Sequence, residues 1–168
     1  LMRPEVVHYR RNLKERYSKP KQAQTLILIP QTQTKPFHRS GEYRQVAKQL
    51  KNQQKENSFH ACFYAAPFGI VPIELDEVYP LSQHETAMPL DRETIDYVAS
   101  QTADYITRTN YKTVILVNDP ENWSEIVQRR GKNACLQKGI KLKIVNTTKD
   151  LRNELETCNS YLKLKATS

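Results

Sequence analysis

A polar segment from Pro30 to Gly41 carries the side chains best suited to binding and proton transfer. Its amide, hydroxyl, ammonium, imidazole and guanidinium groups belong to Gln31, Thr32, Lys35, His38, Arg39 and Ser40. Such a set can hydrogen-bond the edge of a nucleobase and a phosphate together. The segment has neither a Gly-Lys-Ser/Thr sequence nor a glycine-rich dinucleotide fingerprint. It is therefore either a binding loop of another kind or a polar turn that Pro30 and Pro36 make rigid.

A second segment, from Pro67 to Pro89, is predicted to be one loop of about 23 residues, and loops of that length are usually functional. Gly69 in this segment would allow either a positive φ or the close approach of a ligand to the backbone. Phe68 and Tyr79 are candidates for stacking on a base. The alternative is that these two aromatic side chains hold the loop against the core.

The same segment contains a cluster of carboxylates, Glu74, Asp76 and Glu77. The pKa values of neighbouring carboxylates can differ, so that one group acts as an acid and the other as a base. Glu74 and Glu77 are therefore candidate site residues. The alternative is a short, solvated helix.

The histidines and cysteines do not predict a metal site or a disulfide framework. No metal-ligand spacing links His8, His38, His60, His84, Cys62, Cys135 and Cys158. Three unpaired cysteines are typical of a reducing, cytoplasmic protein. We expect no metal and no cofactor, and Cys62 is predicted to be a small buried residue within a strand.

Positive charge is concentrated in the first third of the 168 residues. Residues 1–55 hold 13 Lys/Arg against 3 Asp/Glu, whereas residues 56–168 hold 13 against 15. A focused positive field attracts polyanions, most often nucleic acid. The predicted nucleic-acid surface consists of six cationic residues: Arg10, Arg11, Lys14, Arg16, Arg39 and Arg44. The alternative is a basic helix that only keeps the domain soluble.

Hydrophobic periodicity predicts a basic helix within residues 1–19 that packs on a single α/β domain at residues 20–168. Buried strands are expected at 25–29, 59–66, 112–118 and 140–145, and helices at 4–17, 43–50, 91–106, 123–139 and 151–162. This alternation predicts a three-layer α/β sandwich with a mostly parallel, four-stranded sheet. Ligands bind such sheets at the carboxyl ends of the strands. No apolar run is long enough to cross a membrane.

The runs Pro67–Pro72 and Leu75–Pro80, taken with the Pro30–Gly41 segment, resemble the domain that follows the transglycosylase-like region of archaeosine synthase. That family is related to archaeal tRNA-guanine transglycosylase, and the resemblance covers residues 3–146. It implies a fold like that of uracil-DNA glycosylase and a role in archaeal tRNA modification. The family adds an amine-bearing amino acid to the nitrile of 7-cyano-7-deazaguanine. Implied partners are tRNA, a transglycosylase-like subunit or domain, and a radical-SAM protein.

The chain departs from the family pattern at a position that bears on chemistry. The family motif reads Pro-Cys-Ser-x-x-Lys-Pro-Tyr-Ser, and Gln31 occupies the cysteine position here while Lys35 is retained. A thiolate can add to a nitrile, but an amide side chain cannot. Three hypotheses follow: a tRNA-binding accessory domain with a degenerate motif, an active amidinotransferase-type enzyme using Lys35 and a carboxylate, or a small-ligand-binding domain with a basic surface.

Overall fold

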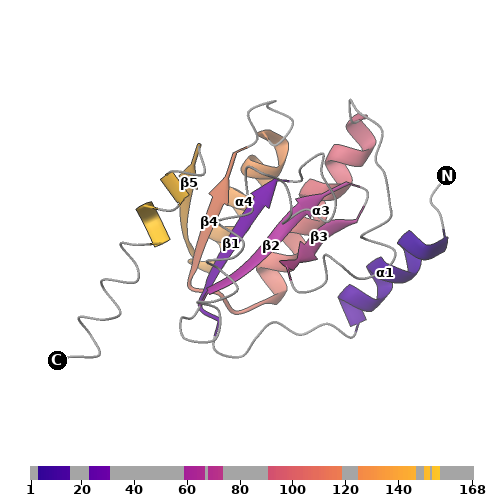
Figure 1. The fold of residues 1–168 in the computed structure, drawn as a ribbon, viewed down its shortest axis with the longest axis horizontal. Helices are drawn as coiled ribbons and strands as arrows, with labels where there is room; N and C mark the ends of the chain where they lie inside the picture. Colours follow the sequence, from indigo (N-terminus) through magenta and orange to yellow (C-terminus); the bar gives the residue numbers. More distant parts are fainter. Residues whose placement is uncertain are drawn as a thin grey trace.

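The sheet forms where the sequence has short runs of aliphatic and aromatic residues, because the hydrophobic effect favours their burial. The computed structural model describes residues 4–15, 23–30, 59–66, 68–73, 91–118, 125–146, 150, 151 and 153–155. Its strands are β1 (Thr25–Pro30), β2 (Phe59–Ala65), β3 (Gly69–Pro72), β4 (Thr113–Val117) and β5 (Lys141–Val145). Its helices are α1 (Pro4–Glu15), α3 (Arg92–Arg108) and α4 (Glu125–Lys138) (Figure 1). The predicted helix at 43–50 and Trp123 lie outside the described residues.

The strands form one mixed sheet in the order β3-β2-β1-β4-β5. β1 is central, and its first residue, Thr25, pairs in parallel with both Phe59 of β2 and Thr113 of β4. β5 pairs in parallel with β4, so the four predicted strands are all present. The sheet is mostly parallel, as expected.

The prediction of four strands is wrong, because a fifth strand follows β2 directly. β3 turns back along β2 and pairs with it in antiparallel orientation, from Ala65 with Gly69 to Cys62 with Pro72. Every β3 residue is buried. The segment expected to be one loop from Pro67 to Pro89 therefore begins with a hairpin, which forms because Ile70 and Val71 bury their side chains.

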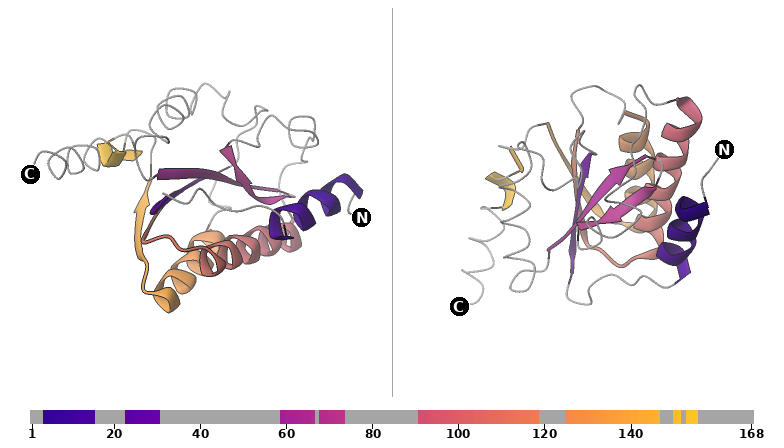
Figure 2. Two further views of the ribbon diagram at one scale, coloured as in Figure 1. Left: turned by 90° about the horizontal axis from the view of Figure 1, so that it is seen from below. Right: turned by 45° about the vertical axis from the view of Figure 1, so that its right-hand side comes forward.

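Helices α3 and α4 pack against each other and cover the same face of the sheet (Figure 2, left). The short helical segment around residues 150–155 lies on the opposite face (Figure 2, right), with Leu151 and Leu155 fully buried. The helix ends carry residue types that typically cap helices. Asp91 caps α3 through its Oδ1, which accepts a 2.7 Å hydrogen bond from Thr94 N. Hydrogen bonding to the Thr94 side chain and to its backbone N–H lowers the pKa of Asp91. Gly139 follows α4 with a φ of +68°.

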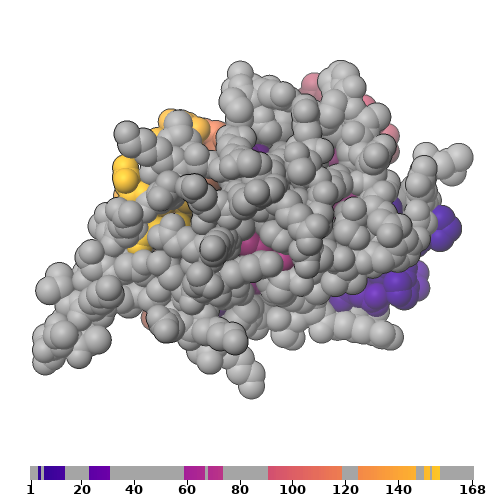
Figure 3. Space-filling view, viewed as in Figure 1, coloured from indigo at the N-terminus to yellow at the C-terminus, as the bar shows by residue number. Residues whose placement is uncertain are grey.

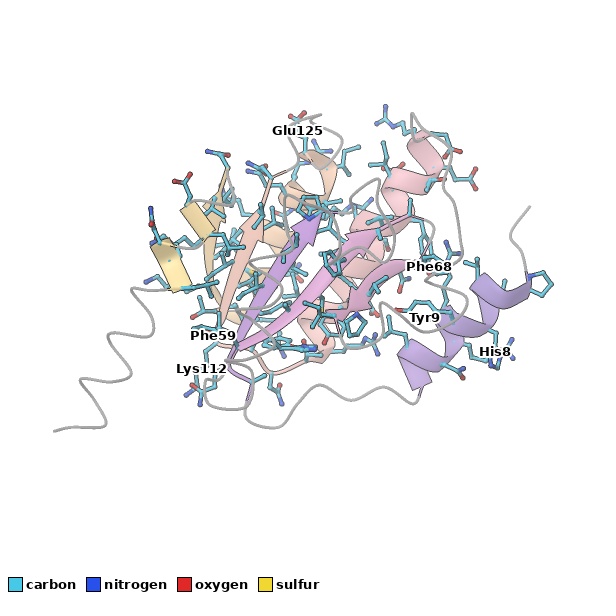
Figure 4. All side chains as sticks on the ribbon, in the orientation of Figure 1. His8, Tyr9, Phe59, Phe68, Lys112 and Glu125 are labelled. Atoms are coloured by element: carbon cyan, nitrogen blue, oxygen red, sulfur yellow. The ribbon has the colours of Figure 1, made fainter. Side chains whose placement is uncertain are left out.

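Helix α1 is attached to the sheet edge through Tyr9. The Tyr9 hydroxyl donates a 2.8 Å hydrogen bond to the carbonyl of Ile70 in β3, and its ring meets Phe68 edge to face with centroids 5.2 Å apart (Figure 4). Val6 and Leu13, on the same helix face, are 1% and 5% exposed. α1 lies at the molecular surface at the end opposite β5 (Figure 3). The predicted apolar face of this helix is confirmed.

Replacing Gly69 with alanine is expected to lower the free energy of unfolding by about 2–4 kcal/mol, from left-handed backbone strain plus overpacking. Its φ is +89°, and a Cβ here would lie 2.9 Å from Gln101 Cβ of α3. Gly139→Ala is the matched control, because its φ is also positive but no atom lies within 4 Å of the added Cβ. The Gly139→Ala variant should lose only about 1 kcal/mol of its free energy of unfolding. Urea denaturation measures both values, and equal losses would contradict close packing at Gly69.

Candidate functional site

The parallel strands β1, β2 and β4 all end at one edge of the sheet (Figure 1). The chain leaves β1 for β2 on one side and leaves β4 for β5 on the other. Such a reversal opens a crevice between the carboxyl ends of the two strands, where ligands bind in open α/β sheets. The candidate site is therefore the edge formed by Pro30 of β1 and Val117–Asn118 of β4, and the predicted polar segment from Pro30 begins there.

Asn118, the first residue after β4, presents an unsatisfied polar atom at this edge. Its backbone N–H donates to the carbonyl of Val145 at 2.9 Å, and its Nδ2 donates to Asn146 Oδ1 at 2.8 Å. Its own Oδ1 is buried and accepts no hydrogen bond from any residue that the structure describes. A buried acceptor without a donor costs about 1–3 kcal/mol, so such an atom is typically satisfied by water or by a ligand.

Tyr64 makes the floor of this edge rigid. It is fully buried in β2, where it pairs with Pro30, and its hydroxyl donates to the carbonyl of Val117 across β1. The ends of β2, β1 and β4 are thus joined by a side chain as well as by the ladder. The sequence did not single out Tyr64 or Asn118. The one local signal was a polar residue directly after the buried run at 113–117.

Most of the predicted site residues fall outside the part of the chain that the structure describes. These are Gln31, Thr32, Lys35, His38, Ser40, Glu74, Glu77 and Tyr79, with Arg16, Arg39 and Arg44 of the predicted nucleic-acid surface; for Lys14 only the backbone is described. β1 and β2 end at the same edge, since Pro30 pairs with Tyr64, and the prediction that both polar segments share a site there depends on residues outside the described part of the chain. β3 runs back along β2, so it ends at Pro72 beside Cys62, in the middle of the sheet.

Phe68 and Gly69, two of the predicted site residues, are enclosed by other parts of the fold. Phe68 is 1% exposed and packs on Tyr9, so the expected alternative, an aromatic side chain holding the segment to the core, is correct. Gly69 has a positive φ and lies against Gln101 and Tyr97 of α3. The space above its backbone is filled by protein.

The two arginines of α1 that the structure describes have different surroundings. The Arg10 guanidinium lies 3.4 Å from the centre of the Tyr97 ring, and burial lowers its pKa even though Tyr97 acts in the opposite sense. Burial also raises the pKa of Tyr97. Arg11 is exposed. Arg10 therefore joins α1 to α3, whereas Arg11 is accessible to a partner.

A buried polar network lies at the other end of β2, near the amino ends of the strands. His60 Nδ1 is 2.7 Å from the Tyr111 hydroxyl, which is 3.0 Å from the Tyr105 hydroxyl, and Cys62 Sγ lies 3.7 Å from His60 Nδ1. All four side chains are at most 4% exposed. The network links β2 to α3 and to the residues before β4, which is a structural role that the sequence did not reveal.

The described cysteines are poorly placed for nucleophilic chemistry. Cys62 and Cys135 are free and buried, and burial raises the pKa of Cys135 to about 11. In the described ranges, no group of three or more His, Cys, Asp or Glu side chains could hold a metal ion. No described helix is long and apolar enough to span a membrane.

Comparison with known sequences identifies the family. Residues 6–160 match the family described as "Domain of unknown function (DUF5591)". The chain belongs to this family. No solved structure matches it.

The DUF5591 chain is similar to several larger archaeal proteins. It is 28% identical to an archaeosine synthase subunit alpha of Methanosarcina acetivorans over 95% of this chain and 26% of that protein. It is 30% identical to the corresponding Thermoplasma acidophilum subunit over 68% of this chain and 22% of the relative. A tRNA-guanine(15) transglycosylase of Saccharolobus solfataricus is 28% identical over 70% of this chain and 22% of that protein. The resemblance to an archaeosine synthase-related family is confirmed, and the chain spans about a quarter of these relatives.

Separate alanine substitutions of Arg10 and Arg11 distinguish their roles. Arg10→Ala removes the guanidinium from the Tyr97 ring and is expected to lower the free energy of unfolding by about 0.5–2 kcal/mol. Arg11→Ala, one residue away, should change it by less than about 0.5 kcal/mol. Denaturant titration of both variants measures the difference. A larger loss for Arg11 would contradict the packing described for α1.

Proposed function

We propose that this chain acts in the archaeosine modification of tRNA, as a tRNA-binding accessory domain. Two observations support the role: relatives with archaeosine synthase and transglycosylase names, and membership of a family that forms about a quarter of those proteins. The accessory character is supported by Gln31, which stands where the resembling motif has cysteine. The partners are tRNA and a transglycosylase-like subunit or domain, with a radical-SAM protein completing the conversion in the cytoplasm.

The proposed domain is a single α/β unit at residues 20–168 with the basic helix of residues 1–19 packed against it. The parallel pairing of β2, β1, β4 and β5 agrees with a layered fold like that of uracil-DNA glycosylase. In this arrangement Arg11, on the exposed side of α1, contacts tRNA phosphate.

The observation that carries the proposal is the unsatisfied Oδ1 of Asn118 at the edge between β1 and β4. A guanine-like base carries N–H donors on its pairing edge, and an amide oxygen is a suitable acceptor for them. The segment with Gln31, Thr32, Lys35, His38 and Ser40 starts from β1 at this same edge. A modified guanine turned out of the tRNA would therefore meet both Asn118 and this segment.

Incubation with tRNA carrying 7-cyano-7-deazaguanine, with and without candidate amino acids, tests the role. Binding without a mass change of the nucleoside is expected. A mass increase that disappears in Lys35→Ala would replace the accessory domain with an active amidinotransferase-type enzyme. Absence of tRNA binding at moderate salt would instead favour a small-ligand-binding domain. A tRNA-binding domain should bind at moderate salt and lose affinity as salt rises, because phosphate contacts release counterions.

The contribution of Asn118 is measured as the preference for tRNA with the cyano base over the same tRNA lacking that base. Asn118→Ala should reduce this ratio of Kd values about tenfold, the size of one lost hydrogen bond. Asn118→Asp keeps an acceptor oxygen and should keep the preference. Asn146→Ala is the matched control, since it removes the neighbouring amide but leaves Asn118 Oδ1 in place. An unchanged ratio in Asn118→Ala would show that water, not the base, satisfies this atom.

A further inference from the structure

The outer face of α4 carries a second concentration of positive charge. Between Glu125 and Asn146 there are six basic residues, Arg129, Arg130, Lys132, Lys138, Lys141 and Lys143, and one acidic residue. The neighbouring helix α3 has two basic and three acidic residues over Arg92–Arg108. The charge balance of +5 is therefore a property of α4 and β5 and does not extend to α3.

The packing of α4 determines which of its faces is exposed to solvent. Val127, Gly131, Ala134 and Cys135 are the buried residues of α4. The helix lies close enough that a Cβ at Gly131 would contact Ile106 and Leu116 at 3.8 Å. The opposite face, which holds Arg129 and Lys132 one turn apart, is exposed, and Arg130 is exposed on the flank of the helix.

These three cations have no carboxylate partner among the described residues, unlike other cations of the chain. Arg108 pairs with Asp104 at 3.3 Å, Lys143 pairs with Glu154 at 2.5 Å, and Arg10 lies on Tyr97. Arg129, Arg130 and Lys132 make no such contact. Their charge is therefore available to an anionic partner.

The position of α4 relates this charge to the candidate site. Glu125, at the start of the helix, lies at the end of the molecule where the parallel strands finish (Figure 4). Arg129 follows roughly 6 Å along the helix axis and Lys132 about 4.5 Å further. A polyanion with one base at the carboxyl edge would have neighbouring phosphates within reach of this face.

We infer that Arg129 and Lys132 form an RNA phosphate-binding face on α4, separate from the basic helix α1. Guanidinium groups bind phosphate oxygens in pairs, and an exposed row of unpaired cations releases counterions when phosphate replaces them. The inference rests on the proposed tRNA role, because it assigns the phosphates to the tRNA that presents the base.

The test measures binding of fluorescent tRNA at several KCl concentrations for the Arg129→Gln/Lys132→Gln double variant. Affinity at low salt should fall about tenfold, and the slope of log K against log salt should decrease by about 1–2. The matched control is Arg92→Gln/Lys112→Gln, which removes the same charge from exposed positions outside α4 and β5 and should change affinity less than about twofold. Circular dichroism checks that each variant is folded.

Three outcomes overturn the inference, and they are distinguishable. If the unaltered chain does not bind tRNA, the proposed function itself fails. If it binds and the α4 variant binds equally well, or the control loses as much, the proposed function stands and α4 is not the contact face. If polyglutamate of equal charge competes as well as unlabelled RNA, the face binds acidic polymers in general.

Discussion

The parallel pairing of β1 with strands on both sides is the constraint on which the rest of the structure depends. Thr25 is aligned with Phe59 and Thr113, so β2 and β4 start level with β1, and their carboxyl ends are brought to one edge. Burial of Leu26, Ile27, Leu28 and Ile29 leaves this strand no alternative position. The candidate site is a consequence of that alignment, because the polar residues after each strand can meet only where the strands end together.

A second constraint comes from the hairpin of β2 and β3. Its reversal places Ile70 beside α1, where the Ile70 carbonyl accepts the Tyr9 hydrogen bond, and it ends β3 at Pro72 beside Cys62. One backbone conformation at Gly69 thus determines both where α1 is attached and where β3 ends. Arg10 on Tyr97 completes the attachment to α3.

Local pattern predicted the four parallel strands and the helices α1, α3 and α4, because these depend on neighbours in sequence. It failed at Gly69–Pro72, where Pro67-Phe68-Gly69 is typical of a loop but tertiary burial favours a hairpin. It also missed Tyr64, Asn118 and the His60 network, whose partners lie 28–53 positions away. The charge of α4 was missed for a different reason: averaged over residues 56–168 the balance is negative, although the contiguous stretch 125–146 holds six basic residues and one acidic residue.

Among the described strands, β5 is at the margin of the sheet, and its lysines have a consequence for self-association. Lys141 and Lys143 alternate along it and are exposed, so a second copy approaching edge to edge would bring like charges together over unpaired backbone groups. Charged residues on a strand margin prevent such sheets from joining into aggregates. A domain protected in this way can stay separate beside other folded regions.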